Sequence, residues 1–537
     1  MRLATKRLLV VKYYKRRSLF AKQVEPVSHP KNSNESDHRS IRDPAQYDVI
    51  CAGGGLSANL SAALLAKSGK RVLLIEDEDY ARPRVFDKGI YFDPDFTPFC
   101  SFEARSILGR CFKELGIDVS AELKPLKAIT QVLSSRYRIA FSQESKETLQ
   151  EIQREVEVAP QTVAGFFGLL YKVGEKSPVV LEKVLTLGQA NRKDIAHWRK
   201  FWGSYYKSIH GHQPVKLQTV LRAQRFGDGA RECEILGSAL LGGLSFAAPN
   251  NLGFEQVVRS LPLYLAGQGL YSGGIASLKT RLADYVKSHG GAVRTTTVEA
   301  LSVEKKKITG VVLSSFEGVC KGDLVILCGK LRRLYRQLPN SFQEQSVVRS
   351  LDRIQPSHWR FTIAVSIEKD VLPIGITPHM TYLGSPNYPL EEENFLRIQT
   401  ISDENAEQAT ILVTALVPYR ASSLDYGYLR RLAGKMMQAL SSLIPFLDKH
   451  VVSIYPDFRA NDLAIRELYP FKGPDWVSEN LLQYYVRGHR GVQEFWGPTL
   501  TTPHRNLYFG GRSIWPALGL YGEVLSARKI YEDIQRL

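Results

Sequence analysis

The sequence lacks long apolar runs, and nowhere do eighteen consecutive hydrophobic residues occur. A helix that crosses a bilayer needs about twenty such residues, so a membrane-spanning helix is not expected. Cysteine is also scarce, with six in 537 residues and no Cys-x-x-Cys pair. We therefore expect reduced thiols, not a disulfide framework or a zinc site. The six are Cys51, Cys100, Cys111, Cys233, Cys320 and Cys328.

Acidic residues are in short supply as well. The chain has 54 Asp and Glu against 71 Lys and Arg, which gives a formal charge of +17. This balance fits contact with an anionic membrane, and a plain basic surface is the alternative. No basic module interleaved with aromatic residues is visible, so nucleic acid is not an expected partner. A hydrophobic content of 44% is enough for ordinary buried cores.

The N-terminal segment carries part of the positive charge. Its first 24 residues hold eight Lys or Arg and no acid, and the polar stretch 27–42 resembles a linker. Three interpretations remain open: an organelle transit peptide, a basic arm that touches a membrane, or a disordered extension. The expected location is cytoplasmic or peripheral to a membrane, with mitochondrion or plastid as the alternative. Ribosome or nucleic-acid association through this arm is a further, weaker hypothesis.

The clearest local pattern in the sequence comes just after the N-terminal segment. A short apolar strand is predicted over 49–52, a glycine turn over 53–55, a helix over 57–67 and a second strand over 71–75. Such a βαβ unit, with glycines at its first crossing, is typical of dinucleotide binding, and an ordinary glycine-rich turn is the alternative.

Each special residue in this unit has a physical reason. Gly53, Gly54 and Gly55 would let backbone N–H groups at a helix N-terminus approach a pyrophosphate. Ala58 stands where a small residue allows helix and strand to pack closely. Glu76 ends the second strand, eighteen positions after Ala58, where its carboxylate could accept the ribose hydroxyls.

Further along the chain, α/β segments like this one alternate with regions of a different kind. Residues 160–272 are predicted to be mostly helical, and 359–418 to form an antiparallel sheet. A second α/β segment over 279–328 and a strand, glycine turn and helix from 506 onwards would return to the first domain. One nucleotide-binding domain is therefore expected to be assembled from separated pieces.

Four segments in this order resemble phytoene desaturase and retinol saturase-like flavoproteins, which are related to amine oxidases and GDP-dissociation inhibitors. The segments are Gly53–Ala58 with Glu76, Gly89–Asp93, Gly273–Leu278 with Gly290, Gly291 and Val298, and Leu507–Arg512 running through Gly519 and Gly522 to Ser526. The resemblance covers about residue 46 to the C-terminus.

The resemblance implies an FAD site. Gly53, Gly54, Gly55 and Ala58 would lie at the pyrophosphate, Glu76 at the ribose, backbone of Val298 at the adenine, and Gly511, Arg512, Gly519 and Gly522 along the ribityl chain and isoalloxazine. The implied chemistry is hydride transfer to or from the flavin, which forms or reduces a C–C double bond in a long apolar substrate. It implies no catalytic acid or base. His379, Tyr484, Tyr485 and Arg487 could touch substrate, although core or surface roles are the simpler expectation.

Two departures from the family pattern bear on FAD binding, and the first of them motivates a rival; the second is milder, because some carotenoid-type members share it. The Gly-Gly turn that usually follows the ribose acid is absent, and only Arg82 or Arg84 could supply charge there. Arg512 stands where many relatives carry an acid. The rival is a flavin-deficient relative that binds a lipid or protein.

The expected fold class is α/β, with a discontinuous Rossmann-like FAD-binding domain and an α+β substrate domain. The expected segments are a basic extension 1–45, the FAD-binding parts 46–125, 266–345 and 486–537, and the substrate parts 126–265 and 346–485.

Overall fold

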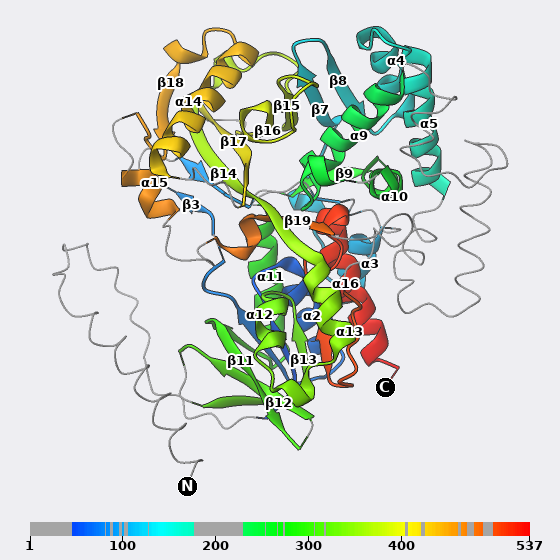
Figure 1. The fold of residues 1–537 in the computed structure, drawn as a ribbon, viewed down its shortest axis with the longest axis vertical. Helices are drawn as coiled ribbons and strands as arrows, with labels where there is room; N and C mark the ends of the chain where they lie inside the picture. The colour runs from blue at the N-terminus through cyan, green and yellow to red at the C-terminus, as the bar shows by residue number, and fades with distance from the viewer. Residues whose placement is uncertain are drawn as a thin grey trace. The chain divides into compact units, whose positions relative to one another are not determined.

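The computed structural model of the protein (Figure 1) describes eighteen stretches of the chain. They are 46–80, 82–85, 90–95, 99–100, 102, 106–126, 128–176, 229–252, 254–265, 267–271, 274–305, 307–315, 318–402, 406–419, 425–459, 463–469, 477–486 and 498–536. Residues 45–537 form one unit by their contacts. The predicted extension 1–45 lies outside the described residues.

A seven-stranded sheet carries the glycine turn, in the lower part of the view in Figure 1. The core of this sheet is parallel, in the order β10-β2-β1-β13, and β20 also lies parallel to β13. On the far side of β13, strands β12 and β11 continue in antiparallel fashion. The strands are β1 (Tyr47–Ala52), β2 (Val72–Glu76), β10 (Ala292–Thr295), β11 (Val298–Glu304), β12 (Lys307–Leu313), β13 (Val319–Leu327) and β20 (Leu507–Phe509).

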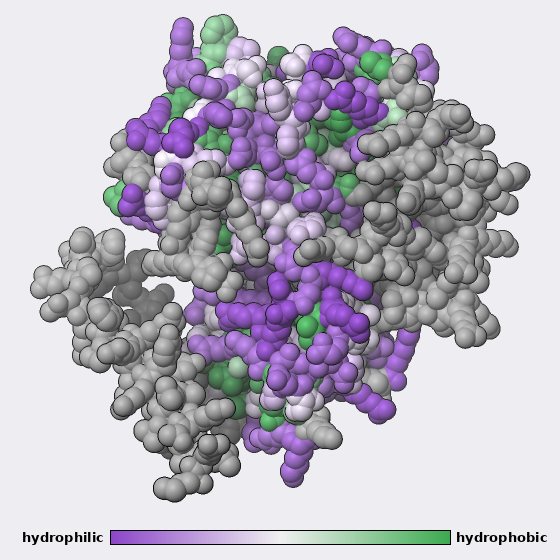
Figure 2. Space-filling model, in the orientation of Figure 1, coloured by the Kyte–Doolittle hydropathy of each residue, from purple (hydrophilic) through white to green (hydrophobic). Residues whose placement is uncertain are grey.

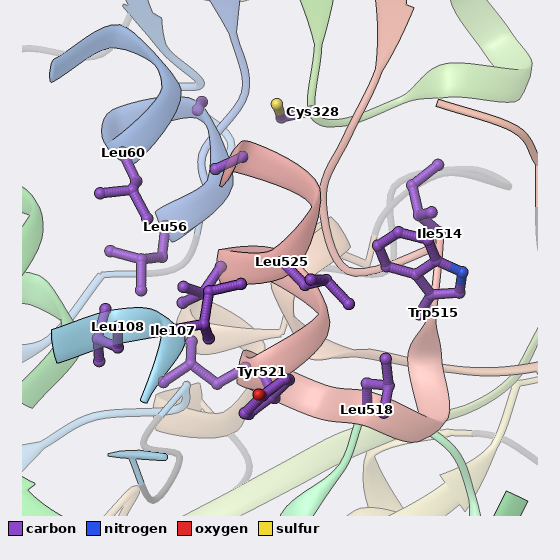
Figure 3. Close-up of a cluster of buried hydrophobic side chains, with 14 of the residues drawn as sticks. Leu56, Leu60, Ile107, Leu108, Cys328, Ile514, Trp515, Leu518, Tyr521 and Leu525 are labelled. Atoms are coloured by element: carbon purple, nitrogen blue, oxygen red, sulfur yellow. The ribbon is translucent and has the colours of Figure 1, made fainter. Parts of the chain in front are cut away.

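Helix α2 (Leu56–Lys67) is buried on almost every side. It contacts β1 and β2 as well as α11 (Gly274–Ser288) and α16 (Gly519–Ile534). Small residues make this possible, because the sequence of α2 contains four alanines and two serines, all buried. Figure 3 shows the apolar side chains with which α2, α16 and the start of α3 (Ile107–Leu115) pack, among them Leu56, Leu525 and Ile107.

The second sheet lies in the upper part of Figure 1 and has eight strands in the order β18-β14-β17-β16-β15-β7-β8, with β19 also paired to β14. All its pairs are antiparallel except β15 with β7. The strands are β7 (Ala128–Ser134), β8 (Arg138–Ser142), β14 (Ile354–Glu368), β15 (His379–Leu383), β16 (Phe395–Ile401), β17 (Gln408–Pro418), β18 (Val451–Tyr455) and β19 (Leu482–Val486).

Helix α14 (Tyr426–Leu443) packs on this sheet, because Leu429, Leu432 and Met436 share one apolar cluster with strand residues such as Ile363. The other helices are α4 (Ser145–Glu155), α5 (Pro160–Lys176), α9 (Ala230–Leu244), α10 (Phe254–Leu265), α12 (Leu331–Arg336), α13 (Gln345–Arg353) and α15 (Leu463–Leu468). Short strands complete the fold: β3 (Arg84–Val85) with β4 (Tyr91–Phe92), and β9 (Gln268–Tyr271) with β5 (Phe99–Cys100) and β6 (Leu123–Pro125).

The predicted fold class is confirmed, because strands from three separated parts of the chain form one Rossmann-like sheet beside an antiparallel sheet with a helical insert. Two local predictions were wrong. Residues 268–271 form strand β9 although a mostly helical region was expected, because they pair with β5 and β6 from earlier in the chain. Helix α11 begins at Gly274, not at residue 279.

Other sequence expectations can be checked in the described residues. Five of the cysteines are buried as thiols, whereas the side chain of Cys100 is not described. None of the described helices is both long and apolar enough to cross a bilayer. The face of the molecule shown in Figure 2 is mostly hydrophilic, with hydrophobic residues in small separate groups.

Candidate functional site

The glycine turn between β1 and α2 is packed against the chain's own residues. Gly53 has φ +149°, and a Cβ on it would lie 2.8 Å from the carbonyl carbon of Cys328. A Cβ on Gly54 would overlap the ring of Tyr80, and one on Gly55 would lie 2.7 Å from Oε2 of Glu523. The three glycines are therefore required by close approach, as the sequence predicts, but side chains of this chain make that approach.

A carboxylate occupies the N-terminus of α2. Glu523, on the second turn of α16, is fully buried, and its Oε2 accepts a hydrogen bond from the backbone N–H of Ser57 at 3.1 Å. The N-terminal N–H groups of a helix lack partners within the helix, and the helix dipole favours a negative charge there. A dinucleotide-binding helix presents these groups to its pyrophosphate. Here Glu523 takes the position of that anion.

Arg512 holds Glu523 in place. Its Nε lies 3.1 Å from Oε1 of Glu523, and its two terminal nitrogens donate to Asp95 at 3.1 and 3.0 Å. The same nitrogens donate to the Asn480 carbonyl at 2.8 Å and to the Tyr80 hydroxyl at 2.7 Å. Burial alone would lower the pKa of Arg512, but these acidic neighbours raise it well above its usual value. Its guanidinium is thus fully engaged in contacts within the chain.

Asp95 connects Arg512 to the second sheet. It accepts hydrogen bonds from Arg360 on β14 and from the Tyr80 hydroxyl, the latter at 2.5 Å. Burial would raise the pKa of Asp95, but Arg512 and Arg360 lower it to about 2. Tyr80 itself lies between Gly54 and the ammonium group of Lys279, which is 4.2 Å from its ring centre. Tyr80, from the segment that follows Glu76, therefore covers the first glycine turn at Gly54.

A further buried acid lies beside the turn. Glu479, in a short 3₁₀ turn over Glu479–Leu481, accepts the backbone N–H of Lys330 at 2.8 Å and would touch a Cβ on Gly329. Burial raises the pKa of Glu479 to about 7, and Asp77 adds to this effect. Glu479 therefore adds a third carboxyl group to the cluster, one that titrates near neutral pH.

The expected adenosine side has a different character. Glu76 ends β2 and is half-buried, and Val298 begins β11 with its carbonyl accepting Arg333 at 3.2 Å. A cavity of about 10 Å3, the size of one water, lies between them and is lined by Gly53, Val298 and the ion pair of Lys330 with Asp77. The nitrogen and oxygen of Lys330 and Asp77 lie 2.8 Å apart.

The C-terminal glycines serve close packing. Gly511 has φ +92°, and its N–H donates to the hydroxyls of Ser57 and Ser526 at 3.2 and 3.3 Å. Gly519 has φ +53° and lies against Leu244 and Tyr264 of the helical insert, away from the first glycine turn. A Cβ on Gly522 would lie 2.9 Å from the Trp515 carbonyl. The structure thus brings Gly511 and Arg512 to the Gly53–Gly55 turn, whereas Gly519 faces another neighbour.

The residues present do not fit the diphosphate of FAD. Glu523 fills the anion position at α2, the Tyr80 ring covers Gly54, and Arg512 is engaged by Asp95 and Glu523. Two like charges about 4 Å apart repel by about 4 kcal/mol at the effective dielectric of a protein site, so a phosphate beside Glu523 would be strongly disfavoured. FAD binding therefore stays a prediction, and the predicted cofactor residues stay candidates.

Sequence reasoning missed Glu523, Tyr80 and Asp95. One signal was available: Glu523 is the single charge in the run Ile514–Ala527, which otherwise holds only apolar and small residues, and it follows the arginine at 512 that replaces the usual acid. The basic residue Arg512 and the lone acidic residue Glu523, eleven positions later, together indicate a buried ion pair.

Among the weaker candidates that the structure describes, Tyr484 reaches the cluster beside the turn, because its side chain hydrogen-bonds Glu479, and burial raises its pKa well above the usual value. His379 is buried on β15, where its Nδ1 lies 2.7 Å from the amide nitrogen of Gln399, and burial lowers its pKa to about 3. Tyr484 is buried and Tyr485 half-buried on β19, while Arg487 lies outside the described residues. Arg82 and Arg84 are exposed. In the described part of the chain, no group of three His, Cys, Asp or Glu side chains could hold a metal ion.

Comparison with known proteins identifies the fold. No family model and no curated protein matches the sequence. Putrescine oxidase bound to putrescine has a TM-score of 0.56 at 15% identity, covering 92% of this chain and 100% of its own. Cyclohexylamine oxidase from Brevibacterium oxydans has a TM-score of 0.54 at 14% identity, covering 92% and 100%. An oxidoreductase from Methanosarcina mazei has a TM-score of 0.53 at 14% identity, covering 90% and 99%.

Identities this low support the fold alone. The matches extend over nearly the whole length of these oxidases. The chain has the fold of these amine oxidases.

Proposed function

We propose that this chain is a non-redox member of the amine oxidase fold that acts as a binding factor for a lipid or a protein. The single observation that carries the proposal is the Glu523 carboxylate on the Ser57 N–H, at the N-terminus of α2. A fold does not determine a function, and a site whose cofactor position is filled by the protein itself supports binding more than electron transfer.

The chemistry of the closed turn supports this proposal. A diphosphate would have to displace Glu523 from Arg512 and from the helix N-terminus, and would also have to displace Tyr80 from Gly54. Displacing Glu523 leaves a carboxylate and a guanidinium without each other in a buried place, which is costly. The network thus holds the turn, α16 and β14 together without a cofactor.

Charge supports the choice of partner. The net charge of +17 would favour an anionic surface such as a lipid bilayer, and part of it lies in residues 1–50, which carry a net +6. Peripheral contact of this kind needs no spanning helix. We therefore include contact with anionic membrane in the proposal.

The test is a visible absorption spectrum of the purified full-length protein, followed by a titration with FAD. We expect no flavin bands between about 350 and 500 nm and no quenching of FAD fluorescence, because the diphosphate position is filled. A yellow protein with one flavin per chain would overturn the proposal. Lipids extracted from the same sample and identified by mass spectrometry would define the ligand.

A second candidate is favoured by the retained βαβ unit with Glu76 and by the oxidases among the structural matches. It is an FAD-dependent oxidoreductase that forms or reduces C–C double bonds in a long apolar substrate of carotenoid, isoprenoid or retinoid type. It requires Glu523 and Tyr80 to leave their observed positions. Bound flavin that is reduced or oxidised in the presence of a polyene would favour it over the first candidate.

A further inference from the structure

A second polar cavity lies in the other domain, against the antiparallel sheet. It measures about 20 Å3, slightly more than one water-sized group needs. Its wall includes Thr130, Arg360, His379, Thr381, Arg397 and Gln399, from the four strands β7, β14, β15 and β16. Arg360 links this wall to the network of Arg512 through Asp95, but the wall includes no residue of the glycine turn.

Arg397 brings a positive charge to this cavity without an acid of its own. It is 8% exposed, and it donates to the carbonyls of Gly242 and Ser245 and to the side-chain oxygen of Gln483, the last two at 2.8 and 3.1 Å. The nearest buried acid, Asp95, forms its ion pairs with Arg360 and Arg512. Among the described residues, no carboxylate forms an ion pair with Arg397, and a buried charge without a counter-charge is costly.

The pKa of Arg397 reports this environment. Burial, together with the nearby charge of Arg360, lowers it to about 9, although Tyr264 and Asp95 act in the opposite direction. A guanidinium is normally protonated in any protein, so a shift of this size indicates a strongly unfavourable place for a cation. An anion in the cavity would supply the counter-charge that Arg397 lacks and would offset both effects.

Two hydrogen-bond donors on residues that line the cavity have no acceptor among the described residues. The Nε atoms of Arg397 and Arg360 are buried and have no hydrogen-bond partner in the described part of the chain. His379 adds no charge, because burial keeps its imidazole neutral at any ordinary pH. The cavity therefore offers the guanidinium of Arg397, which has no counter-charge among the described residues, and the unpartnered Nε of Arg360, whose own charge is paired with Asp95.

We propose that this cavity binds a small monovalent anion, either a halide or a carboxylate the size of formate, held by Arg397 and Arg360. Its size excludes phosphate esters and longer acids, and its charge disfavours cations. The site goes beyond the proposed function, because Arg397, which supplies its charge, lies on the second sheet and forms no ion pair with the described members of the network of Arg512. Arg360 belongs to both places, since it also donates to Asp95.

The test uses the full-length protein in a buffer whose only anion is gluconate, which is too large for the cavity. Bromide or formate is added at constant ionic strength while thermal unfolding is recorded. If an ion binds in the cavity, we expect Tm to rise with the concentration of that ion and to level off about 2–4 °C above its starting value. The two titrations distinguish a halide from a carboxylate. No rise with either ion would overturn the proposal.

Variants separate the site from general salt effects. Arg397→Gln should weaken the apparent bromide affinity at least about tenfold. Arg259→Gln is the matched control, because Arg259 is another buried arginine, on α10, and it does not line the cavity. An equal Tm rise in wild type and Arg397→Gln would contradict the proposal.

A second measurement does not depend on how the variants fold. Crystals of the wild-type protein soaked in bromide should show an anomalous peak at ion-pair distance from the Arg397 guanidinium. Density for water alone at that place, with bromide bound only on the surface, would overturn the proposal.

Discussion

Arg512 and Arg397 are two arginines that are almost equally buried, 4% and 8% exposed, in opposite electrostatic surroundings. Arg512 lies among Asp95, Glu523 and the Tyr80 hydroxyl, which raise its pKa, whereas Arg397 lies among carbonyl groups beside Arg360, and its pKa is lowered. The comparison teaches that burial alone does not decide what an arginine does. The first completes a closed network, and the second leaves positive charge for a ligand.

The largest effect should come from breaking the closed network. Arg512→Met would leave Asp95 and Glu523 buried without one of their cations, and removing one member of a buried ion pair costs about 3–5 kcal/mol. Urea unfolding of wild type and variant would measure this loss. Arg512→Lys keeps the charge but not the fork of donors, so its free energy of unfolding should lie between those of wild type and Arg512→Met. A loss below about 1 kcal/mol would show that the network contributes little.

Glu479 should make stability depend on pH near neutrality. Its pKa is raised to about 7 in the folded protein from an ordinary value of 4.5, so the folded state keeps a proton that the unfolded state releases. The stabilisation is therefore complete below about pH 4.5 and is lost as the pH rises to about 7, by about 3 kcal/mol. Denaturant unfolding from pH 4.5 to 8 would show this fall.

Glu479→Gln should flatten that fall, since an amide does not titrate. Glu304→Gln, which removes an exposed acid on β11, is the matched control and should leave the pH profile as in wild type. An unchanged profile in Glu479→Gln would assign the dependence to another group.

Removing the carboxylate at the helix N-terminus should open the anion position. Glu523→Ala frees the Ser57 N–H and one side of Arg512, at a cost of about 2 kcal/mol. We expect ADP, which carries the diphosphate without a flavin, to raise the Tm of this variant but not of wild type. Calorimetric titration would give the affinities. Glu523→Gln keeps the shape and should bind ADP more weakly than Glu523→Ala.

The smallest effect concerns the contact of Tyr80 with Gly54. Gly54→Ala places a Cβ in the Tyr80 ring and should destabilise the fold by about 1–2 kcal/mol. In a Tyr80→Ala background the same change should cost much less, and a double-mutant cycle measures the difference. Gly434→Ala on α14, with no atom near its Cβ, should stabilise by about 0.5 kcal/mol. Equal costs of Gly54→Ala in both backgrounds would contradict the contact.

The fold was predictable from local patterns because a glycine turn between strand and helix, and runs of apolar and β-branched residues such as those in β17, depend on neighbours within a few residues. Strands β16 and β17 are buried on both faces over most of their length, although one buried face was expected. The order of the segments then indicated the discontinuous sheet. The glycines at 53–55 were predicted to approach a pyrophosphate, which stays a prediction, and the structure shows them close to Cys328, Tyr80 and Glu523. Short elements without a strong pattern, such as β9, were not predictable, because their pairing partners lie far along the chain.

The occupants of the site were harder to predict for the same reason. Glu523 and Ser57 are separated by 466 positions, and Asp95 and Arg512 by 417. A single glutamate in a helix usually faces solvent, and only its apolar neighbours and the arginine at 512 distinguish Glu523 from that case. The buried Arg397 gave no signal, since an arginine in an alternating strand is expected on the exposed face.

The pairing of β20 with β13 has a consequence for biosynthesis. Val325 pairs with Leu507, and the network needs Arg512 and Glu523, so the first sheet and its ion pairs lack their last members until almost the whole chain has left the ribosome. Until then Asp95 and Arg360 have each other but not Arg512, and α2 has no carboxylate on its N-terminus. Nascent chains released before about residue 523 should therefore be held by chaperones or degraded, because the contacts that close the fold come from its C-terminal end.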